Sequence, residues 1–165
     1  MVLLAMLVVF FFLWSSESSA SQFLRLPSNG GTVGRSRLSG VNLPEWELDT
    51  IMRIADEIGV DPRYLAAIRI AENGGPGREF GVLSVSAPTY EEQARVAAIS
   101  IRNNIGRYES ATGSSAIDDL GRLTQAFTEF MANRWAPVGA ENDPTSLNRY
   151  WPRNVMTAYL NAESV

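Results

Sequence analysis

A helix with strong start and stop signals dominates the middle of the sequence, at residues 61–77. Asp61 suits the N-cap, and Pro62 suits the first helical position, where a missing N–H costs nothing. Asn73 is followed by Gly-Gly-Pro-Gly, which ends the helix because glycine adopts the left-handed cap and proline cannot continue the hydrogen-bond ladder. We therefore expect one well-bounded helix here, with the rest of the chain organised around it.

Glu72 is the unusual residue of this predicted helix. It follows Leu65 by seven positions and Ile68 by four, so helical spacing places its carboxylate on the same face as these apolar side chains. Burial among apolar groups and the partial negative charge of a helix C-terminus both favour the protonated acid. These conditions make a carboxyl group a proton donor near neutral pH. The alternative is a solvated surface glutamate, which a small rotation of the helix would produce.

The absence of histidine and cysteine narrows the possible chemistry. It excludes Ser-His-Asp and Cys-His catalysis, histidine-ligated zinc and disulfide frameworks. Carboxylates remain as the acid–base groups. The net charge of −4 does not support nucleic-acid binding, which usually needs a basic face. We therefore expect no nucleic-acid partner, no metal and no cofactor.

The chain begins with an apolar run at residues 2–14, followed by a serine-rich segment. The run is short for a membrane-spanning helix, which needs about 20 residues. Residues 1–20 are typical of an export signal, with a possible cleavage after Ala20. However, no arginine precedes the run, which fits an export signal badly, and Arg25 follows it. If the segment stayed as an uncleaved anchor, the positive-inside rule would place the C-terminal part in the cytoplasm. A cleaved signal is the preferred interpretation, and an anchor is the alternative.

The remaining chain predicts a linker and one mainly α-helical domain. Residues 21–43 have the glycine- and serine-rich composition of a flexible linker. The chain of 165 residues is long enough for one domain with a proper core, which we place at residues 44–165. A capping box at Thr89 and Glu92 begins one of its helices. Besides the central helix, apolar spacing predicts helices over residues 44–59, 89–113, 118–134, 146–151 and 153–160, with at most a small β-hairpin within residues 78–87.

Two motifs resemble the lysozyme-like superfamily, in particular lytic transglycosylases, phage virion muramidases and glucosaminidase-type domains. The first is AIRIAENG at residues 67–74, followed by GVLS at 81–84. In that superfamily the glutamate that ends such a helix is the general acid, and a glycine-containing turn lines the cleft. The second is FMANRWAP at 130–137, followed by ENDP at 141–144, which resembles a stretch that glucosaminidases place across the cleft. The Met-Gln pair that usually follows the Gly-Leu of transglycosylases is absent.

The resemblance covers residues from about 44 to 160 and implies a lysozyme-like domain that cleaves the glycan strands of peptidoglycan. It implies that Glu72 is the catalytic acid and that Gly81 and Val82 line the cleft beside it. Aromatic rings suit the apolar faces of sugars, and asparagines can hydrogen-bond N-acetyl groups. For Phe80 and Trp151, packing in the core is an equal alternative. The further candidate substrate contacts are Asn73, Phe80, Tyr90, Trp135, Asn142 and Tyr150.

The second step of such a reaction stays open at this point. It needs either another carboxylate or the N-acetyl group of the substrate. The candidate carboxylates are Glu79, Glu91, Glu92, Glu141 and Asp143, of which Glu92 is better explained by its capping box. If none serves, a single-acid mechanism of the transglycosylase type follows.

The leading hypothesis is therefore a monomeric peptidoglycan-cleaving glycosidase that is exported to the periplasm or the cell exterior, or carried in a virion. The first alternative is a non-catalytic lysozyme-like protein that binds glycan or forms part of a virion. The second is a helical interaction domain that residues 2–14 tether to a membrane.

Overall fold

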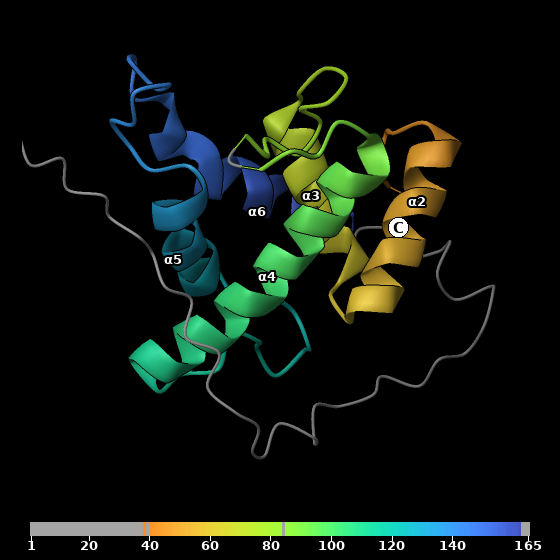
Figure 1. The fold of residues 1–165 in the computed structure, drawn as a ribbon. Coiled ribbons are helices and arrows are strands. Elements are labelled where there is room, and N and C mark those ends of the chain that lie inside the picture. The colour runs from red at the N-terminus through yellow and green to blue at the C-terminus, as the bar shows by residue number, and fades with distance from the viewer. Residues whose placement is uncertain (1–37, 39, 84, 163–165) are drawn as a thin grey trace, which may run out of the picture.

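The computed structural model describes residues 38, 40–83 and 85–162, which form a mainly helical fold. The mainly α class expected from the sequence is confirmed. In Figure 1, the long helix α4 crosses the molecule, with α2 on one side and α5 on the other. The helices are α2 (Glu45–Ile58), α3 (Pro62–Glu72), α4 (Tyr90–Thr112), α5 (Gln125–Trp135) and α6 (Trp151–Asn161), with a 3-10 helix η1 (Leu147–Tyr150) before α6.

The central helix α3 begins and ends close to where the sequence indicates. The Asp61 side chain accepts a hydrogen bond of 2.9 Å from the Arg63 backbone N–H, and Pro62 is the first helical residue. The stretch from Tyr64 to Ile68 is buried, and α3 packs against α2, α4 and α6. A helix that is enclosed on several sides lies inside the core. The left-handed residue that ends α3 is Asn73, with φ 46°, rather than one of the glycines after it.

The folded part starts earlier than the predicted boundary at residue 43. Leu38 is 3% exposed and belongs to the hydrophobic core, and Val41 and Leu43 pack against that core. The last residues of the predicted linker 21–43 therefore belong to the folded structure. The predicted signal or anchor at residues 1–20 and the rest of the linker lie outside the described residues. Within the part of the chain that the structure describes, no helix has the length and apolar character needed to cross a membrane.

Helix α4 begins at the predicted capping box. The Thr89 side chain accepts from the Glu92 backbone N–H, and the Glu92 carboxylate accepts from the Thr89 backbone N–H at 3.0 Å. The helix ends at Thr112, with Gly113 in the left-handed conformation at φ 68°. The capping box, which satisfies two backbone donors at the start of the helix, is thus confirmed.

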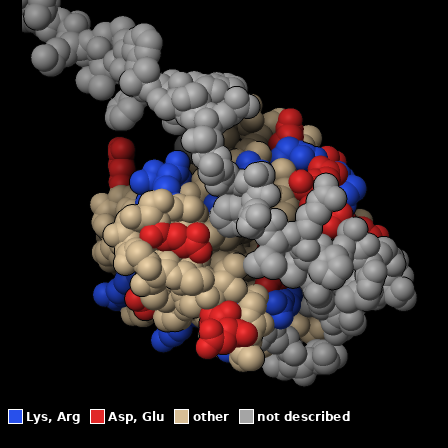
Figure 2. Space-filling view, turned by 90° about the horizontal axis from the view of Figure 1, so that it is seen from below, with Lys and Arg blue, Asp and Glu red and all other residues tan. Residues whose placement is uncertain are grey.

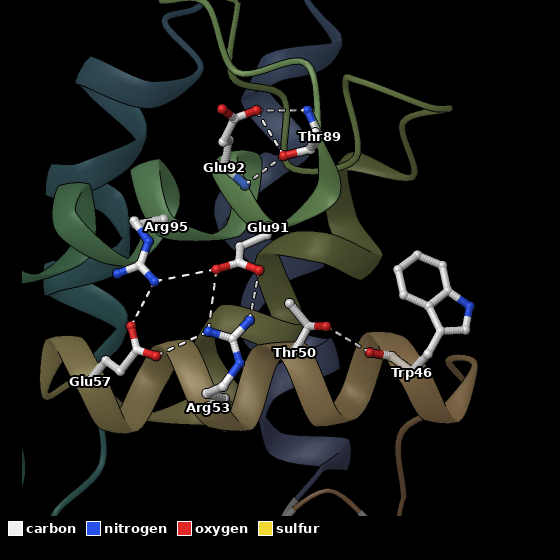
Figure 3. A network of polar contacts seen from close by, with 8 residues as sticks. All are labelled: Trp46, Thr50, Arg53, Glu57, Thr89, Glu91, Glu92 and Arg95. Atoms are coloured by element: carbon white, nitrogen blue, oxygen red, sulfur yellow. Dashed lines mark hydrogen bonds and ion pairs between the residues drawn. The ribbon is translucent and has the colours of Figure 1, made fainter.

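Charged side chains join α2 to α4 at the surface, as Figure 3 shows. Arg53 and Glu57 of α2 form an ion pair of 3.0 Å, and Arg53 also pairs with Glu91 of α4 at 2.8 Å. Arg95 of α4 forms a second ion pair with Glu57, at 2.6 Å. All four side chains are well exposed, so this network contributes little to stability. On the face drawn in Figure 2, acidic and basic side chains are likewise interspersed.

The helix predicted for residues 118–134 begins only at Gln125. The Asp118 carboxylate accepts hydrogen bonds from the backbone N–H groups of Leu120 and Arg122, both at 2.9 Å, and so forms a turn. Leu120, within this turn, is 73% exposed. Thr124 then caps α5. Side-chain bonds to nearby backbone offer an alternative to the helix, and this explains the late start.

The small β-hairpin that the sequence allowed within residues 78–87 does not form. The described residues of that segment are loop, and no strand occurs in 38, 40–83 or 85–162. The β pairing that these residues show is one isolated antiparallel bridge, between Ile117 and Leu123. Within this segment, Val82 and Ala87 are hydrogen-bonded to the side chain of a buried glutamine, Gln93.

Candidate functional site

The Glu72 carboxyl group lies where three helix ends meet. Glu72 is the last residue of α3, Trp135 is the last residue of α5, and Trp151 is the first residue of α6. The indole Nε1–H of Trp135 donates to Glu72 Oε1 at 2.8 Å, and that of Trp151 donates to the same oxygen at 2.7 Å. One carboxylate oxygen therefore accepts two hydrogen bonds from residues that are far away in the sequence.

The environment of Glu72 favours its neutral form. Its side chain is half-buried, and burial raises the pKa of the carboxyl group above its ordinary value. The hydrogen bonds from Trp151 and Trp135 offset part of this effect because they stabilise the charged form. Leu65 and Ile68 of the same helix are completely buried. The prediction that Glu72 lies on the apolar face with a raised pKa is thus confirmed.

Gly81 approaches the same carboxyl group from the loop between α3 and α4. It has φ +68°, and a Cβ atom built on it would lie 2.3 Å from Glu72 Oε2 and 3.0 Å from Oε1. Both the backbone conformation and the close approach require glycine. The structure therefore brings together Glu72 and the turn that the resemblance places beside it.

Gln93 of α4 holds this loop in place, and the sequence analysis did not single it out. It is 1% exposed. Its Nε2 group donates to the carbonyl oxygens of Gly77, Val82 and Ala87 at 2.9 to 3.0 Å, and its Oε1 accepts from the Val82 N–H at 3.2 Å. A glutamine on the buried face of a predicted helix was the available signal, since buried polar side chains need hydrogen-bond partners.

Two predicted substrate contacts belong to the core instead. Phe80 is completely buried and Tyr90 is 8% exposed, and their ring centroids lie 5.2 Å apart in an edge-to-face arrangement. The Trp46 ring also packs against Tyr90, with the ring centroids 4.8 Å apart. A buried ring cannot stack on a saccharide. The expectation for Phe80 and Tyr90 is corrected accordingly, and Val82, which is 6% exposed, offers mainly backbone atoms that are bonded to Gln93.

Three further predicted contacts lie at the surface. Asn73 is exposed and directly follows Glu72, whereas Asn142 is exposed in the loop between α5 and η1. Tyr150 is 37% exposed, and the guanidinium groups of Arg149 and Arg153 lie over its ring at 4.8 and 5.2 Å. Of these residues, Asn73 is next to Glu72 in the chain, and Tyr150 is next to Trp151, a Glu72 partner.

Three candidate second carboxylates already have structural partners. Glu91 pairs with Arg53, and Glu92 completes the capping box. Asp143 is 5% exposed, and its two oxygens accept from the backbone N–H groups at the start of η1, at 2.7 and 3.2 Å. These contacts explain the three side chains without a catalytic role.

Glu79 and Glu141 differ from those three carboxylates. Glu141 is exposed in the loop after α5. Glu79 is 9% exposed; its Oε1 accepts from the Gly77 N–H at 3.0 Å, and its Oε2 is buried without a hydrogen-bond partner among the described residues. Glu79 lies on the same loop as Gly81, two positions before it. Unlike the other three, neither Glu79 nor Glu141 pairs with an arginine or caps a helix in the part of the chain that the structure describes.

A hollow of about 280 Å³ opens on the surface of α5, η1 and α6. Glu72 does not line it, although Ala136 and Pro152, which neighbour the two indole-bearing residues in sequence, do. Its lining residues are Glu129, Ala132, Asn133, Ala136, Val138, Asn148, Arg149 and Pro152. The hollow is therefore a separate feature beside the helix ends that carry Trp135 and Trp151.

Replacing Gly81 by alanine is expected to displace the Glu72 carboxyl group. Left-handed backbone costs about 1–2 kcal/mol in a residue with a Cβ atom, and the displaced carboxyl group also loses two hydrogen bonds, each worth about 0.5–1.5 kcal/mol. We expect Gly81→Ala to lower the free energy of unfolding by about 3 kcal/mol in urea denaturation.

Gly139→Ala is the matched control for this substitution. Gly139 has φ +78°, but a Cβ atom there would meet nothing within 4 Å. It should lose only the conformational part, about 1 kcal/mol. Equal losses in the two variants would show that the approach of Gly81 to Glu72 has no energetic consequence.

Within the described residues, no three acidic side chains gather in a way that could hold a metal ion.

Searches of protein-family models, curated proteins and solved structures found no match to this chain.

Proposed function

We propose that this protein cleaves glycosidic bonds of peptidoglycan, with Glu72 as the general acid. The observation that carries the proposal is the half-buried Glu72 carboxyl group, whose pKa burial raises and whose orientation two indoles fix. A proton donor for a glycosidic oxygen needs a raised pKa and a fixed orientation. The motifs at residues 67–74 and 130–137 supply the lysozyme-like part of the proposal, and the mainly helical fold is compatible with it.

The first step is transfer of the Glu72 proton to the glycosidic oxygen while the C–O bond to the sugar breaks. For the second step we favour assistance by the N-acetyl group of the substrate, because Glu91, Glu92 and Asp143 are engaged in structural contacts. The 6-hydroxyl of the same sugar then closes an anhydro ring and returns its proton to the Glu72 carboxylate. Glu79 and Glu141 are the candidates left for a two-carboxylate variant of the mechanism.

The second candidate function is a non-catalytic protein that binds glycan or forms part of a virion. One observation favours it: the hydrogen bonds of Glu72 join the ends of α3, α5 and α6, so this residue has a structural role of its own. A substrate in the cell wall also requires export or transport in a virion. The apolar run at residues 2–14 is the feature that predicts export or membrane association, and it lies outside the described residues.

Mass spectrometry of the soluble products from purified sacculi separates these functions. We expect the full chain to release disaccharide muropeptides that carry anhydro-muramic ends, since no second carboxylate is required for that product. Sacculi incubated without the protein provide the background. Reducing muramic or glucosamine ends would instead identify a hydrolase and the bond it cuts. Binding to sacculi without any release of muropeptides would refute the proposed activity and select the non-catalytic function.

A further inference from the structure

The two hydrogen bonds that Glu72 accepts are unequally distributed over its oxygens. Both indole N–H groups donate to Oε1, at 2.8 and 2.7 Å. A carboxyl oxygen has two lone pairs, so two donors occupy both of them on Oε1. The neutral acid must then carry its proton on the other oxygen, Oε2. This is the oxygen closest to the position that a Cβ atom on Gly81 would take.

We propose that Trp135 and Trp151 are positioning residues that keep Oε1 as a hydrogen-bond acceptor and so direct the acid proton of Glu72 to Oε2, on the side of the Gly81 loop. This inference rests on the proposed function, because it specifies the atom from which the glycosidic oxygen receives its proton. The leaving-group oxygen of the substrate is thus expected to approach Oε2 along the loop formed by residues 81–83.

The choice of indole as donor has a chemical consequence. An indole N–H is neutral and cannot lose its proton at ordinary pH, so it holds the carboxyl group without the full counter-charge that an arginine would add. A nearby cation lowers the pKa of a carboxyl group by about 1–3 units, which would oppose the effect of burial on Glu72. Two indoles therefore orient Glu72 while burial still keeps its pKa raised.

The same bonds strengthen as the reaction proceeds. A hydrogen bond to a carboxylate is about twice as strong as one to a neutral carbonyl oxygen. Negative charge develops on Glu72 while its proton moves to the leaving group. Donors already aimed at Oε1 stabilise this charge without reorganising, and interactions that strengthen toward the transition state raise the rate.

Nuclear magnetic resonance of the indole N–H groups tests the assignment without any substrate. In the full chain, we expect the Nε1–H signals of Trp135 and Trp151 to shift together with pH, with one shared midpoint above the ordinary carboxyl value. In Glu72→Gln both shifts should disappear. Trp46 is the internal reference, because its ring packs against Tyr90 and should not follow Glu72. Signals that do not follow Glu72 would overturn the proposal.

Trp135→Phe and Trp151→Phe remove one donor each and keep an aromatic ring in place. Each should move the midpoint of the remaining indole signal to higher pH, because a contact that stabilises the charged form is lost. In the cleavage assay each should lower kcat about tenfold with little change in KM. The alkaline limb of the pH–rate profile should move to higher pH, since the acid form persists longer. Trp46→Phe is the matched control and should change none of these quantities.

The outcomes separate this inference from the proposed function. If the indole signals follow Glu72 but the protein releases no muropeptides, the proposed enzymatic activity is refuted. The assignment of the proton to Oε2 is then still supported. If Trp135→Phe and Trp151→Phe release muropeptides as fast as the wild type, the enzymatic activity is supported and the positioning role of the two indoles is refuted. A merely structural role of the indoles would lower the melting temperature without moving the midpoint or the pH–rate profile.

Discussion

Glu72→Gln is expected to reduce muropeptide release about a thousandfold, because general acid catalysis typically contributes 10²–10⁴-fold. The glutamine side chain has the same shape, and its Oε1 can still accept from Trp135 and Trp151. Only the acid proton is lost. Release rates from purified sacculi, measured for both proteins at equal concentration, give the ratio. Undiminished release by the variant would remove Glu72 from the mechanism.

The same variant is expected to be at least as stable as the wild type at neutral pH. Burial raises the pKa of Glu72 in the folded state, so protonated Glu72 stabilises the fold below the pKa of the unfolded chain. That contribution is lost as the pH rises through the folded-state pKa. Glutamine stays neutral throughout.

Urea denaturation at two pH values checks this sign. The two proteins should have similar free energies of unfolding at about pH 3.5, below the ordinary carboxyl pKa. At pH 7.5 the variant should be the more stable protein. A Glu72→Gln protein that is less stable at pH 7.5 would mean that the charged form of Glu72 supports the fold, contrary to the environment described above.

Glu47→Ala is expected to lower the free energy of unfolding by about 3 kcal/mol, the lower end of the cost of breaking a buried ion pair. Glu47 is 5% exposed, and its two oxygens accept from the Arg69 guanidinium at 2.8 and 3.2 Å. The pair joins α2 to α3. Its loss leaves the cation of Arg69 largely buried without this partner, which explains the large penalty. Urea denaturation at neutral pH measures it.

Glu57→Ala provides the comparison within the same helix. Glu57 also contacts two arginines, Arg53 and Arg95, at 3.0 and 2.6 Å (Figure 3), but all three side chains are well exposed. Water screens this pair, and exposed ion pairs contribute little. We expect a much smaller loss than for Glu47→Ala. Similar losses at the two positions would show that burial does not decide the effect.

The sequence predicts where a helix begins when side chains close to that position bond its first backbone N–H groups. Asp61 and Pro62 mark the start of α3, and Thr89 with Glu92 marks the start of α4, because these residues bond backbone groups within one turn. The start of the next helix was predicted wrongly, because apolar spacing alone placed it at Asp118. The Asp118 carboxylate instead bonds backbone N–H groups in a turn, which apolar spacing does not reveal.

The candidate site was predictable only in part. The position of Glu72 follows from helical spacing to Leu65 and Ile68, which is a local property. Its partners Trp135 and Trp151 are 63 and 79 positions away, and no local pattern indicates that contact. Aromatic composition likewise could not separate surface rings from core rings, so the two alternatives for Phe80 stayed open until its complete burial decided for the core.

The hydrogen bonds from Gln93 to the loop after α3 also affect which substitutions this loop tolerates. The hydrogen bonds of the Gln93 side chain go to main-chain atoms of Gly77, Val82 and Ala87, so they do not depend on which side chains the loop carries. Leu83 and Val85 are 58% and 51% exposed. Substitutions at these two positions can therefore change the surface of the loop while the backbone beside the Glu72 carboxyl group keeps its conformation, which makes them suitable starting points for directed evolution.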